Sequence, residues 1–203
     1  MTSQIRPVLT IFAFLTLVTG VVYPLVITGI GAALFADAAS GSLIVRDGRP
    51  VGSRLIGQAF TEPQYFWGRP SATGGAPYNA LASGGTNQGP LNPALVDAAK
   101  GRMEGLRAVD PGNNAPVPVD LVTASASGLD PHISVAAANY QVARVARARG
   151  LPVERVRELV TKHSTDRWLG LFGEPTVNVL ELNLALDETA VRGPDGATVP
   201  GSE

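Results

Sequence analysis

The chain of 203 residues contains no cysteine. Disulfides therefore cannot hold its fold together, and neither a thiol nucleophile nor a cysteine-ligated zinc site is available. Its two histidines, His132 and His163, lie too far apart for the His-Glu-x-x-His pattern of a helical zinc site. We therefore expect no bound metal.

The chain also lacks an excess of charge of either sign. Sixteen Lys and Arg residues stand against 17 Asp and Glu, which gives a formal net charge of −1. Because proteins that bind nucleic acid carry a basic excess, we expect no nucleic-acid partner. Neither lysine follows a Gly-x-x-x-x-Gly frame, and the chain has no Gly-x-Ser-x-Gly or Ser-x-x-Lys pattern. These absences leave no signature of an enzyme.

Charge is missing altogether from Pro7 to Ala36, which is a run of apolar and small residues. About 20 such residues in a helix suffice to cross the hydrocarbon core of a bilayer, which is roughly 30 Å thick. The sequence therefore predicts a short cytoplasmic N-terminus (1–7), a transmembrane helix (8–36), one extracytoplasmic domain (37–191) and a flexible tail (192–203). The protein is expected in the cell (inner) membrane, with this single helix among the lipids.

The orientation of this helix depends on little charge. Arg6 precedes it and Asp37 follows it. Long downstream domains cross the membrane largely regardless of their own charge, so the N-terminus is expected inside and the domain outside. The alternative is a cleaved signal peptide, with Ala36-Asp37-Ala38 as the cleavage site. Its apolar core would be about twice the usual 7–15 residues, so a retained anchor is favoured.

Proline and small residues interrupt the predicted membrane helix. Pro24 removes one backbone hydrogen bond and is expected to bend it. Gly20, Gly29 and Ala32 are small enough to let another helix approach closely. Both features are common in membrane helices, but a lone anchor surrounded by lipid does not need them. We therefore expect this helix to pack against a partner.

The rest of the chain mixes helix and strand signals, so its fold class is α+β. Asp47-Gly48 between apolar runs predicts a β-hairpin over 43–56. Asn92-Pro93 is a favoured helix start, and a helix is expected to about Val109, with residues 95, 98, 99, 103 and 106 inside. Two further helices, 134–149 and 152–163, are expected to form a hairpin around Gly150.

Two segments are harder to assign. The run 117–124 is apolar enough to predict a strand. Residues 177–186 alternate as a strand does, with leucines at 180, 182, 184 and 186. However, Asn178 followed by Glu181 resembles a helix cap. A helix is preferred for this last element.

Between these elements, residues 61–92 show little periodicity and are rich in glycine, proline and aromatic side chains. A compact domain seldom keeps so long a loop unless the loop has a role. Aromatic side chains with Arg and Asn are typical of interface anchors. A partner interface is the first interpretation, a loop folded on its own side chains the second, and an anion site at the Ser-Gly-Gly run the third. The candidate residues are Gln58, Phe66, Trp67, Arg69, Pro70, Tyr78, Asn79, Ser83, Gly84, Gly85, Asn87 and Gln88.

Asp130 and His132 are the one pair that resembles catalytic machinery. A carboxylate can orient an imidazole, as in a catalytic triad. However, Asp130-Pro131-His132-Ile133-Ser134 stands where a helix is expected to begin, and Asp or Ser there would cap it. Capping is preferred, and an anchored extracytoplasmic enzyme or binding module that uses this pair is the alternative.

Taken in order, the motifs of the chain resemble one family closely. It is the C-subunit family of the Kdp-type potassium-transporting P-type ATPases of bacteria. The resemblance extends over nearly the whole chain. It rests on Tyr23-Pro24, Gly57-Gln58-Ala59-Phe60, Phe66-Trp67-Gly68-Arg69-Pro70-Ser71, Tyr78-Asn79, Ser83 to Pro90, Ser127 to Ser134, Gly173-Glu174-Pro175 and Val177 to Leu180.

The resemblance implies a subunit that is not an enzyme by itself. In that family a channel-like potassium-binding subunit works with a P-type ATP-hydrolysing subunit. The C subunit is a single-pass partner, needed for assembly and described as raising the affinity of the ATPase subunit for ATP. Ser83, Gly84, Gly85 and Gln88 fit a likeness to nucleotide-binding signatures drawn for this family. No cofactor is expected on the chain alone, and ATP would enter through the complex.

This implication conflicts with the predicted topology. ATP is hydrolysed in the cytoplasm, whereas residues 37–191 are expected outside. If the domain is outside, an effect on ATP affinity has to pass through the membrane helices as a bias on the conformation of the pump. The outer domain would then lie over the potassium entrance.

Overall fold

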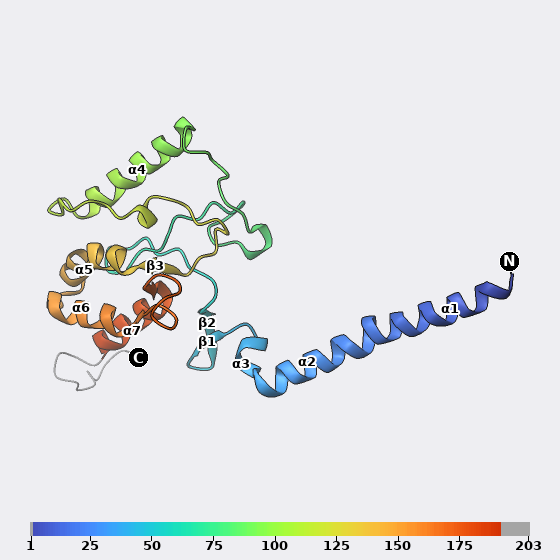
Figure 1. The fold of residues 1–203 in the computed structure, drawn as a ribbon. Helices are drawn as coiled ribbons and strands as arrows, with labels where there is room; N and C mark the ends of the chain where they lie inside the picture. Colours follow the sequence, from blue (N-terminus) through green and yellow to red (C-terminus); the bar gives the residue numbers. More distant parts are fainter. Residues whose placement is uncertain (1, 192–203) are drawn as a thin grey trace. The chain divides into compact units, whose positions relative to one another are not determined.

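The computed structural model describes residues 2–191, and the predicted tail 192–203 lies outside them. The chain divides into two units, one up to Val51 and one from Gly52 onward. The first unit contains the apolar helix and most of a β-hairpin, and the second contains the remaining helices and a small sheet (Figure 1). The α+β class expected from the sequence is confirmed.

The apolar helix runs through α1 (Thr2–Leu17), the π-helical turn η1 (Val18–Val22) and α2 (Tyr23–Leu34). The helix spans 31 residues from Gln4 to Leu34, and its most apolar stretch has a mean hydropathy of 2.2 and is not buried inside the protein. At about 1.5 Å per residue it is long enough to cross a bilayer. Phe35 (φ −135°) breaks it before the short helix α3 (Ala36–Ala39).

The π-helical turn lies directly before Pro24. Proline has no backbone N–H, so an α-helix would leave the carbonyl of Gly20 without its partner and in contact with the proline ring. Here the Tyr23 N–H donates to the Val18 carbonyl, five residues back instead of four. The wider turn accommodates the ring within a continuing helix. The disturbance expected at Pro24 thus takes the form of a π-turn.

The predicted hairpin is confirmed as β1 (Leu43–Arg46) and β2 (Arg49–Ser53). Its two turn residues, Asp47 and Gly48, have φ of 50° and 74°. Asp-Gly is suited to this turn because both positions need the left-handed region that Gly enters freely and Asp tolerates.

In the second unit, a three-stranded sheet has the order β3-β5-β4 and is antiparallel throughout. Its strands are β3 (His132–Ser134), β4 (Ser164–Thr165) and β5 (Thr176–Asn178). β5 is central, and pairs Ile133 with Val177 on one side and Ser164 with Val177 on the other. The strands β3 and β4 were not predicted, because they are too short to show a period-2 pattern.

The strand expected over 117–124 is wrong. The segment contains a 3₁₀ turn, η3 (Val119–Leu121), in place of a strand. Pro116 and Pro118 cannot donate to a β-ladder. The Asp120 carboxylate instead accepts from the backbone N–H and hydroxyl of Ser134, at 2.7 and 3.2 Å. The turn therefore fixes the start of the next helix.

The predicted helices are confirmed with small changes of boundary. α4 (Pro93–Val109) is capped by the Asn92 side chain, and α5 (Val135–Arg149) by Ser134. Gly150, at φ 64°, ends α5 in the left-handed conformation that favours glycine. α6 (Val153–Lys162) then packs back along α5, as the sequence predicted.

The ambiguous segment after residue 176 forms both kinds of structure. β5 ends at Asn178, whose side chain accepts from the Glu181 N–H at 3.1 Å. That cap starts α7 (Val179–Val191). The preferred helix is therefore confirmed from Val179, and the strand interpretation holds only for the residues before it.

The core lies among α5, α6, α7 and the sheet, which Figure 1 shows grouped together with α4 set apart from them. In α4, the residues predicted to face inward are 95, 98, 99, 103 and 106. Of these only Leu106 is buried, and the others are partly exposed. Apart from the loop residue Phe66, the apolar side chains with at most 1% exposure come from the other elements: Ile133, Ala137, Ala138, Val145, Ala146, Val156, Val160, Val177, Leu182 and Leu186.

Candidate functional site

The segment 57–92, called here the 57–92 loop, crosses the second unit with one 3₁₀ turn, η2 (Ala80–Ala82), as its only regular element among the described residues. A segment this long without helix or strand has to satisfy its backbone polar groups in other ways. In this unit, side chains from the helices, the backbone of residues 125–129 and hydroxyl groups of the loop itself provide hydrogen-bond partners.

Two buried carboxamides hold consecutive residues of the loop. The Phe66 N–H donates to Asn183 Oδ1 at 2.8 Å, and Asn183 Nδ2 donates back to the Phe66 carbonyl at 3.0 Å. Gln141 makes the same pair of bonds with Trp67, at 2.9 and 3.1 Å. Each carboxamide supplies one donor and one acceptor, as a neighbouring β-strand would. This arrangement buries the Phe66 ring completely.

Two arginines of α5 extend this attachment. Arg144 donates to the Pro63 carbonyl at 2.5 Å and to the Tyr65 carbonyl at 3.1 Å, with its guanidinium 4.6 Å from the centre of the Trp67 ring. Burial lowers the pKa of Arg144 to about 10, so it stays charged at neutral pH. Arg149 likewise donates to the Gln64 carbonyl.

Arg69, Asp130 and His132 form a polar cluster further along the loop. Arg69 Nη1 lies 3.1 Å from Asp130 Oδ2, and the His132 N–H donates to Asp130 Oδ1 at 3.0 Å. The His132 imidazole Nδ1 lies 3.7 Å from Oδ1. The His132 side chain and backbone N–H, followed by Arg69, keep the pKa of Asp130 below its ordinary value.

The polar cluster has a structural role, because Asp130 connects the loop to the start of β3. Asp130 receives the His132 backbone N–H and the Arg69 guanidinium, which is how a structural carboxylate is used. The helix cap expected from Asp130 or Ser134 is made by Ser134, whose hydroxyl accepts from the Ala137 N–H. Among the residues that the structure describes, no three His, Asp or Glu side chains gather as metal ligands do.

Tyr78 closes the middle of the loop. Its hydroxyl donates to the Arg69 carbonyl at 2.7 Å, and its N–H donates to the Ser71 hydroxyl. Burial, followed by the charge of Asp130, raises the pKa of Tyr78 to about 12. A Cβ on Gly68 would lie 2.6 Å from the Tyr78 hydroxyl, so that glycine makes room for the side chain. Pro70 adds a backbone contact, because its carbonyl accepts from the Ser125 N–H.

The Ser-Gly-Gly run is attached to residues 126–128. The Gly84 N–H and the Ser83 hydroxyl both donate to the Ser127 carbonyl, at 2.9 and 3.0 Å. A Cβ on Gly85 would lie 2.9 Å from the Ala126 carbonyl oxygen, so only glycine fits there without adjustment. The donors that a phosphate would need from Ser83 and Gly84 are thus engaged inside the protein.

The remaining predicted loop residues lie nearer the surface. Asn79 accepts from the Leu81 N–H and donates to the Gly74 carbonyl, so it shapes the turn η2. Asn87 is exposed with a φ of 52°, while Gln88 and Gln58 are partly exposed. The structure thus brings Arg69, Tyr78 and the Asp130 region together, with Asn87 and Gln88 further along the loop.

Gln141, Arg144 and Asn183 were not predicted as site residues. All three are buried, and together they hold residues 63–67. A signal was present for two of them, since Gln141 and Arg144 interrupt the apolar face that Ala137, Val142 and Val145 give α5. A polar residue on an apolar helix face needs a partner in the core.

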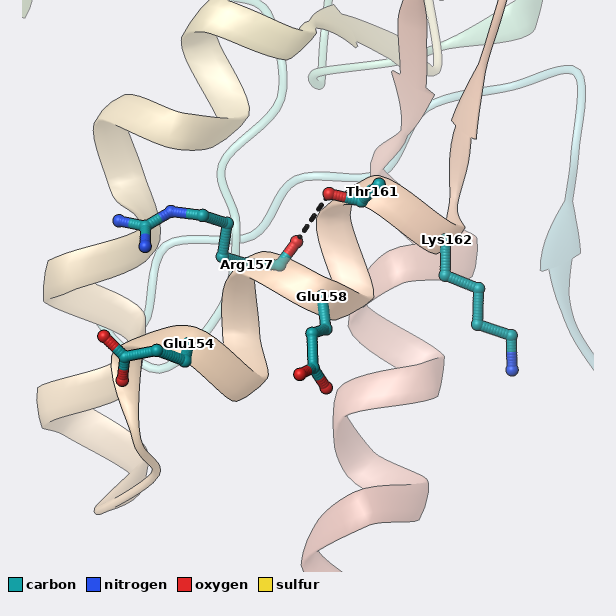
Figure 2. Close-up of a pocket in the computed structure, with 5 residues that line it drawn as sticks. All are labelled: Glu154, Arg157, Glu158, Thr161 and Lys162. Carbon is teal, nitrogen blue, oxygen red and sulfur yellow. Dashed lines mark hydrogen bonds between the residues drawn. The ribbon is translucent and has the colours of Figure 1, made fainter.

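The described residues of the second unit line hollows in two places. One, of about 320 Å³, lies between α4 and the loop and is lined by Phe60, Trp67, Tyr78, Arg69 and Arg102, among others. The other, of about 480 Å³, is an open face of α6 (Figure 2). Its lining side chains come from one helix, and Figure 2 shows their charged ends spread apart instead of meeting at a point. Neither arrangement resembles a catalytic centre.

The class of protein follows from these features. Among the described residues, one apolar helix, long enough to span a bilayer, precedes an α+β unit whose polar loop is held by the helices of that unit. The chain belongs to the family of the C chain of the K⁺-transporting ATPase, whose model matches residues 5–188. The family resemblance seen in the motifs is therefore confirmed.

The relatives of the chain are long matches at high identity. It is 68% identical over 187 residues to a potassium-transporting ATPase KdpC subunit of Polaromonas naphthalenivorans, covering 92% of this chain and 95% of the relative. The subunit of the same name from Ralstonia nicotianae is 67% identical, with 91% and 90% covered. That from Herminiimonas arsenicoxydans is 62% identical, with 93% and 99% covered.

Proposed function

We propose that this chain is a non-catalytic accessory subunit of an ATP-driven potassium uptake pump. Its partners are a P-type ATP-hydrolysing subunit and a channel-like potassium-binding subunit. The observation that carries the proposal is the family match from residue 5 to residue 188, which includes both the apolar helix and the second unit. In this role the chain is needed for assembly of the complex and raises the ATP affinity of the hydrolysing subunit.

The effect on ATP is proposed to pass through the membrane helix instead of through a nucleotide site. The Ser83 hydroxyl and the Gly84 N–H already donate to the Ser127 carbonyl, so these donors are not aimed at a phosphate. A subunit that binds one conformation of the pump better than another changes ATP affinity by that difference alone. Gly20, Gly29 and Ala32 give α2 and η1 an open surface for such a contact.

The partner interface is proposed to use the exposed residues of the 57–92 loop. Leu81 and Leu91 are almost fully exposed, at 99% and 96%. Two exposed leucines on an ordered loop are more favourable when a partner protein covers them than when they contact water. Phe66, Trp67 and Tyr78 would contribute indirectly, because their hydrogen bonds fix the path of the loop. On this proposal the outer unit lies over the potassium entrance.

The topology can be tested directly because the chain has no cysteine of its own. We would place single cysteines at Gln4 and at Asn114, both exposed, and treat intact cells with a membrane-impermeant thiol reagent. Asn114→Cys should react in intact cells and Gln4→Cys only after lysis. The reverse pattern would contradict the outer location and restore direct ATP contact as an explanation.

The interface can be tested with a matched set of exposed apolar residues. The double variant Leu81→Ser with Leu91→Ser should lower the yield of this chain in the purified complex, while the expressed chain stays folded. Val119→Ser, at a site 70% exposed outside the loop, should leave the yield unchanged. Equal yields for the wild type and both variants would show that the loop is not part of the interface. The family assignment would be unaffected.

A further inference from the structure

The turn between β4 and β5 exposes an unusual amount of apolar surface. Residues 168–173 carry no charge, and four of them are large and apolar. The exposed fractions are 69% for Trp168, 72% for Leu169, 78% for Leu171 and 59% for Phe172. Single exposed apolar residues are ordinary, but a contiguous group of this size marks an interaction site. We call residues 167–173 the apolar hairpin.

The apolar hairpin is an ordered structure. Trp168 and Phe172 exchange backbone hydrogen bonds of 2.8 and 3.0 Å, and their ring centres lie 5.7 Å apart. Leu169 and Gly170 make the turn with φ of 52° and 72°. At its base, Arg167 pairs with Glu174 at 3.1 Å. The hydrogen bonds therefore hold the four apolar side chains at the tip in their exposed positions.

The shape of this tip decides what can cover it. A flat protein surface covers one side of a projecting hairpin, but here all four side chains are more than half exposed. A fluid medium surrounds such a tip on every side. The interfacial region of a bilayer is such a medium, and it is where Trp concentrates in membrane proteins. Arg167, at the base, suits the phosphates of lipid headgroups.

A bilayer is also within reach of the second unit. With α1, η1 and α2 in the membrane, only the residues between Leu34 and Gly52 separate the helix from this unit. At no more than about 3.6 Å per residue, this tether holds the start of the unit within roughly 60 Å of the surface. Tethering makes a weak membrane contact effective, because the local concentration of lipid is high.

We propose that the apolar hairpin inserts into the interfacial region of the bilayer that holds the chain's own helix. Trp168, Leu169, Leu171 and Phe172 enter among the upper acyl chains, and Arg167 lies at the headgroups. This contact gives the second unit a second attachment to the membrane. It goes beyond the accessory role proposed above and requires only that the apolar helix be inserted.

The two tryptophans of the chain provide the test. Neither Trp67 nor Trp168 lies in the apolar helix, so quenching of tryptophan emission by lipid cannot come from that helix. We would place the full-length chain in lipid nanodiscs with and without brominated acyl chains. Trp168→Tyr assigns the signal, because it leaves only Trp67, which is fixed by Gln141 and Arg144. The double variant Leu169→Ser with Leu171→Ser keeps Trp168 but removes two of the apolar contacts.

Insertion predicts that brominated lipid quenches the wild-type emission, that Trp168→Tyr abolishes this quenching, and that the serine variant reduces it. Iodide in the buffer should quench the Trp168 emission less when the chain is in nanodiscs than when the second unit is unfolded in 6 M urea, where Trp168 is exposed to solvent. No lipid quenching, together with free access of iodide, would overturn the proposal. Shielding from both quenchers, seen only when the other pump subunits are present, would also overturn it, because a protein partner would then cover the tip.

Discussion

Gln141 and Asn183 replace a strand that the fold does not provide. The backbone at Phe66 and Trp67 is enclosed by α5 and α7, where no neighbouring strand can pair with it. A buried N–H or carbonyl without a partner costs about 1–3 kcal/mol, so each carboxamide removes two such penalties. The two side chains therefore help to fix the path of the loop at Phe66 and Trp67.

Replacing Asn183 by Leu should be strongly destabilising. The side chain keeps the number and branching of its heavy atoms, but the Phe66 N–H and carbonyl lose both partners at a site where Asn183 is only 1% exposed. We expect a loss of about 2–4 kcal/mol in the free energy of unfolding. Thermal unfolding of the full chain in detergent, followed by tryptophan emission, would show it as a lower Tm. Asn114→Leu, at an exposed position, is the control and should change the Tm little.

Because of Asp130, the stability of the second unit should decrease at acidic pH. Its pKa is lowered in the folded protein by His132 and then by Arg69. A carboxylate with a lowered pKa stabilises the fold above its ordinary pKa, which is about 3.9, and this contribution is lost as the pH falls through the folded value. Asp130→Asn should thus lower the Tm at neutral pH, and the gap to the wild type should narrow below about pH 4. The control is Asp97→Asn on the exposed face of α4; a gap unchanged from neutral to acid pH would contradict the role of Asp130.

At the scale of the residue, the sequence identified which residues belong to motifs, but it did not predict what each side chain contacts. Phe66 and Trp67 were expected to be interface anchors, a role that remains a proposal, whereas the structure turns the Phe66 ring into the core. Burial of an aromatic ring depends on contacts more than 70 residues away in the chain. Local pattern carries no information at that separation, which is why Asn183 could not be found from sequence.

At the scale of the element, the helices were predictable because each carries its own signals. Asn92 with Pro93, Ser134 and Gly150 are local caps, and all three act as the sequence indicated. The strands β3 and β4 have two or three residues and depend on pairing with β5, so no local signal defines them. The segment around the 3₁₀ turn resembles a strand in sequence because it is apolar, but only Leu121 and Val122 are buried, and Val119 is exposed.

The Ser-Gly-Gly run can be tested as a structural element. Gly85→Ala places a Cβ 2.9 Å from the Ala126 carbonyl oxygen, and the loop has to shift to relieve it. We expect a loss of about 1–3 kcal/mol, as in other overpacked sites. Gly89→Ala, a few residues further on, has open space around its Cβ and serves as the control. A nucleotide site without structural importance would instead give equal Tm values and a changed ATP affinity of the complex.

At the scale of the whole molecule, the proposed accessory role predicts that the Asp130 and His132 pair takes no part in catalysis. His132→Gln should leave the potassium-stimulated ATP hydrolysis of the purified complex close to the wild-type rate. The His132 backbone N–H, which donates to Asp130, is retained in the variant. Retained assembly with abolished turnover would support the alternative of an anchored enzyme. The measurement is the hydrolysis rate at saturating potassium, normalised to the amount of assembled complex.

The attachment of the loop to the last helix has a consequence for biosynthesis. Residues 63–67 leave the ribosome long before Asn183, which stands 117 positions after Phe66. Until α7 has been made, only water can bond to the N–H and carbonyl of Phe66, and the contact that fixes this part of the loop is missing. A truncated chain therefore lacks the surface that the loop presents. The final path of the loop therefore depends on synthesis of the chain as far as Asn183, near its last helix.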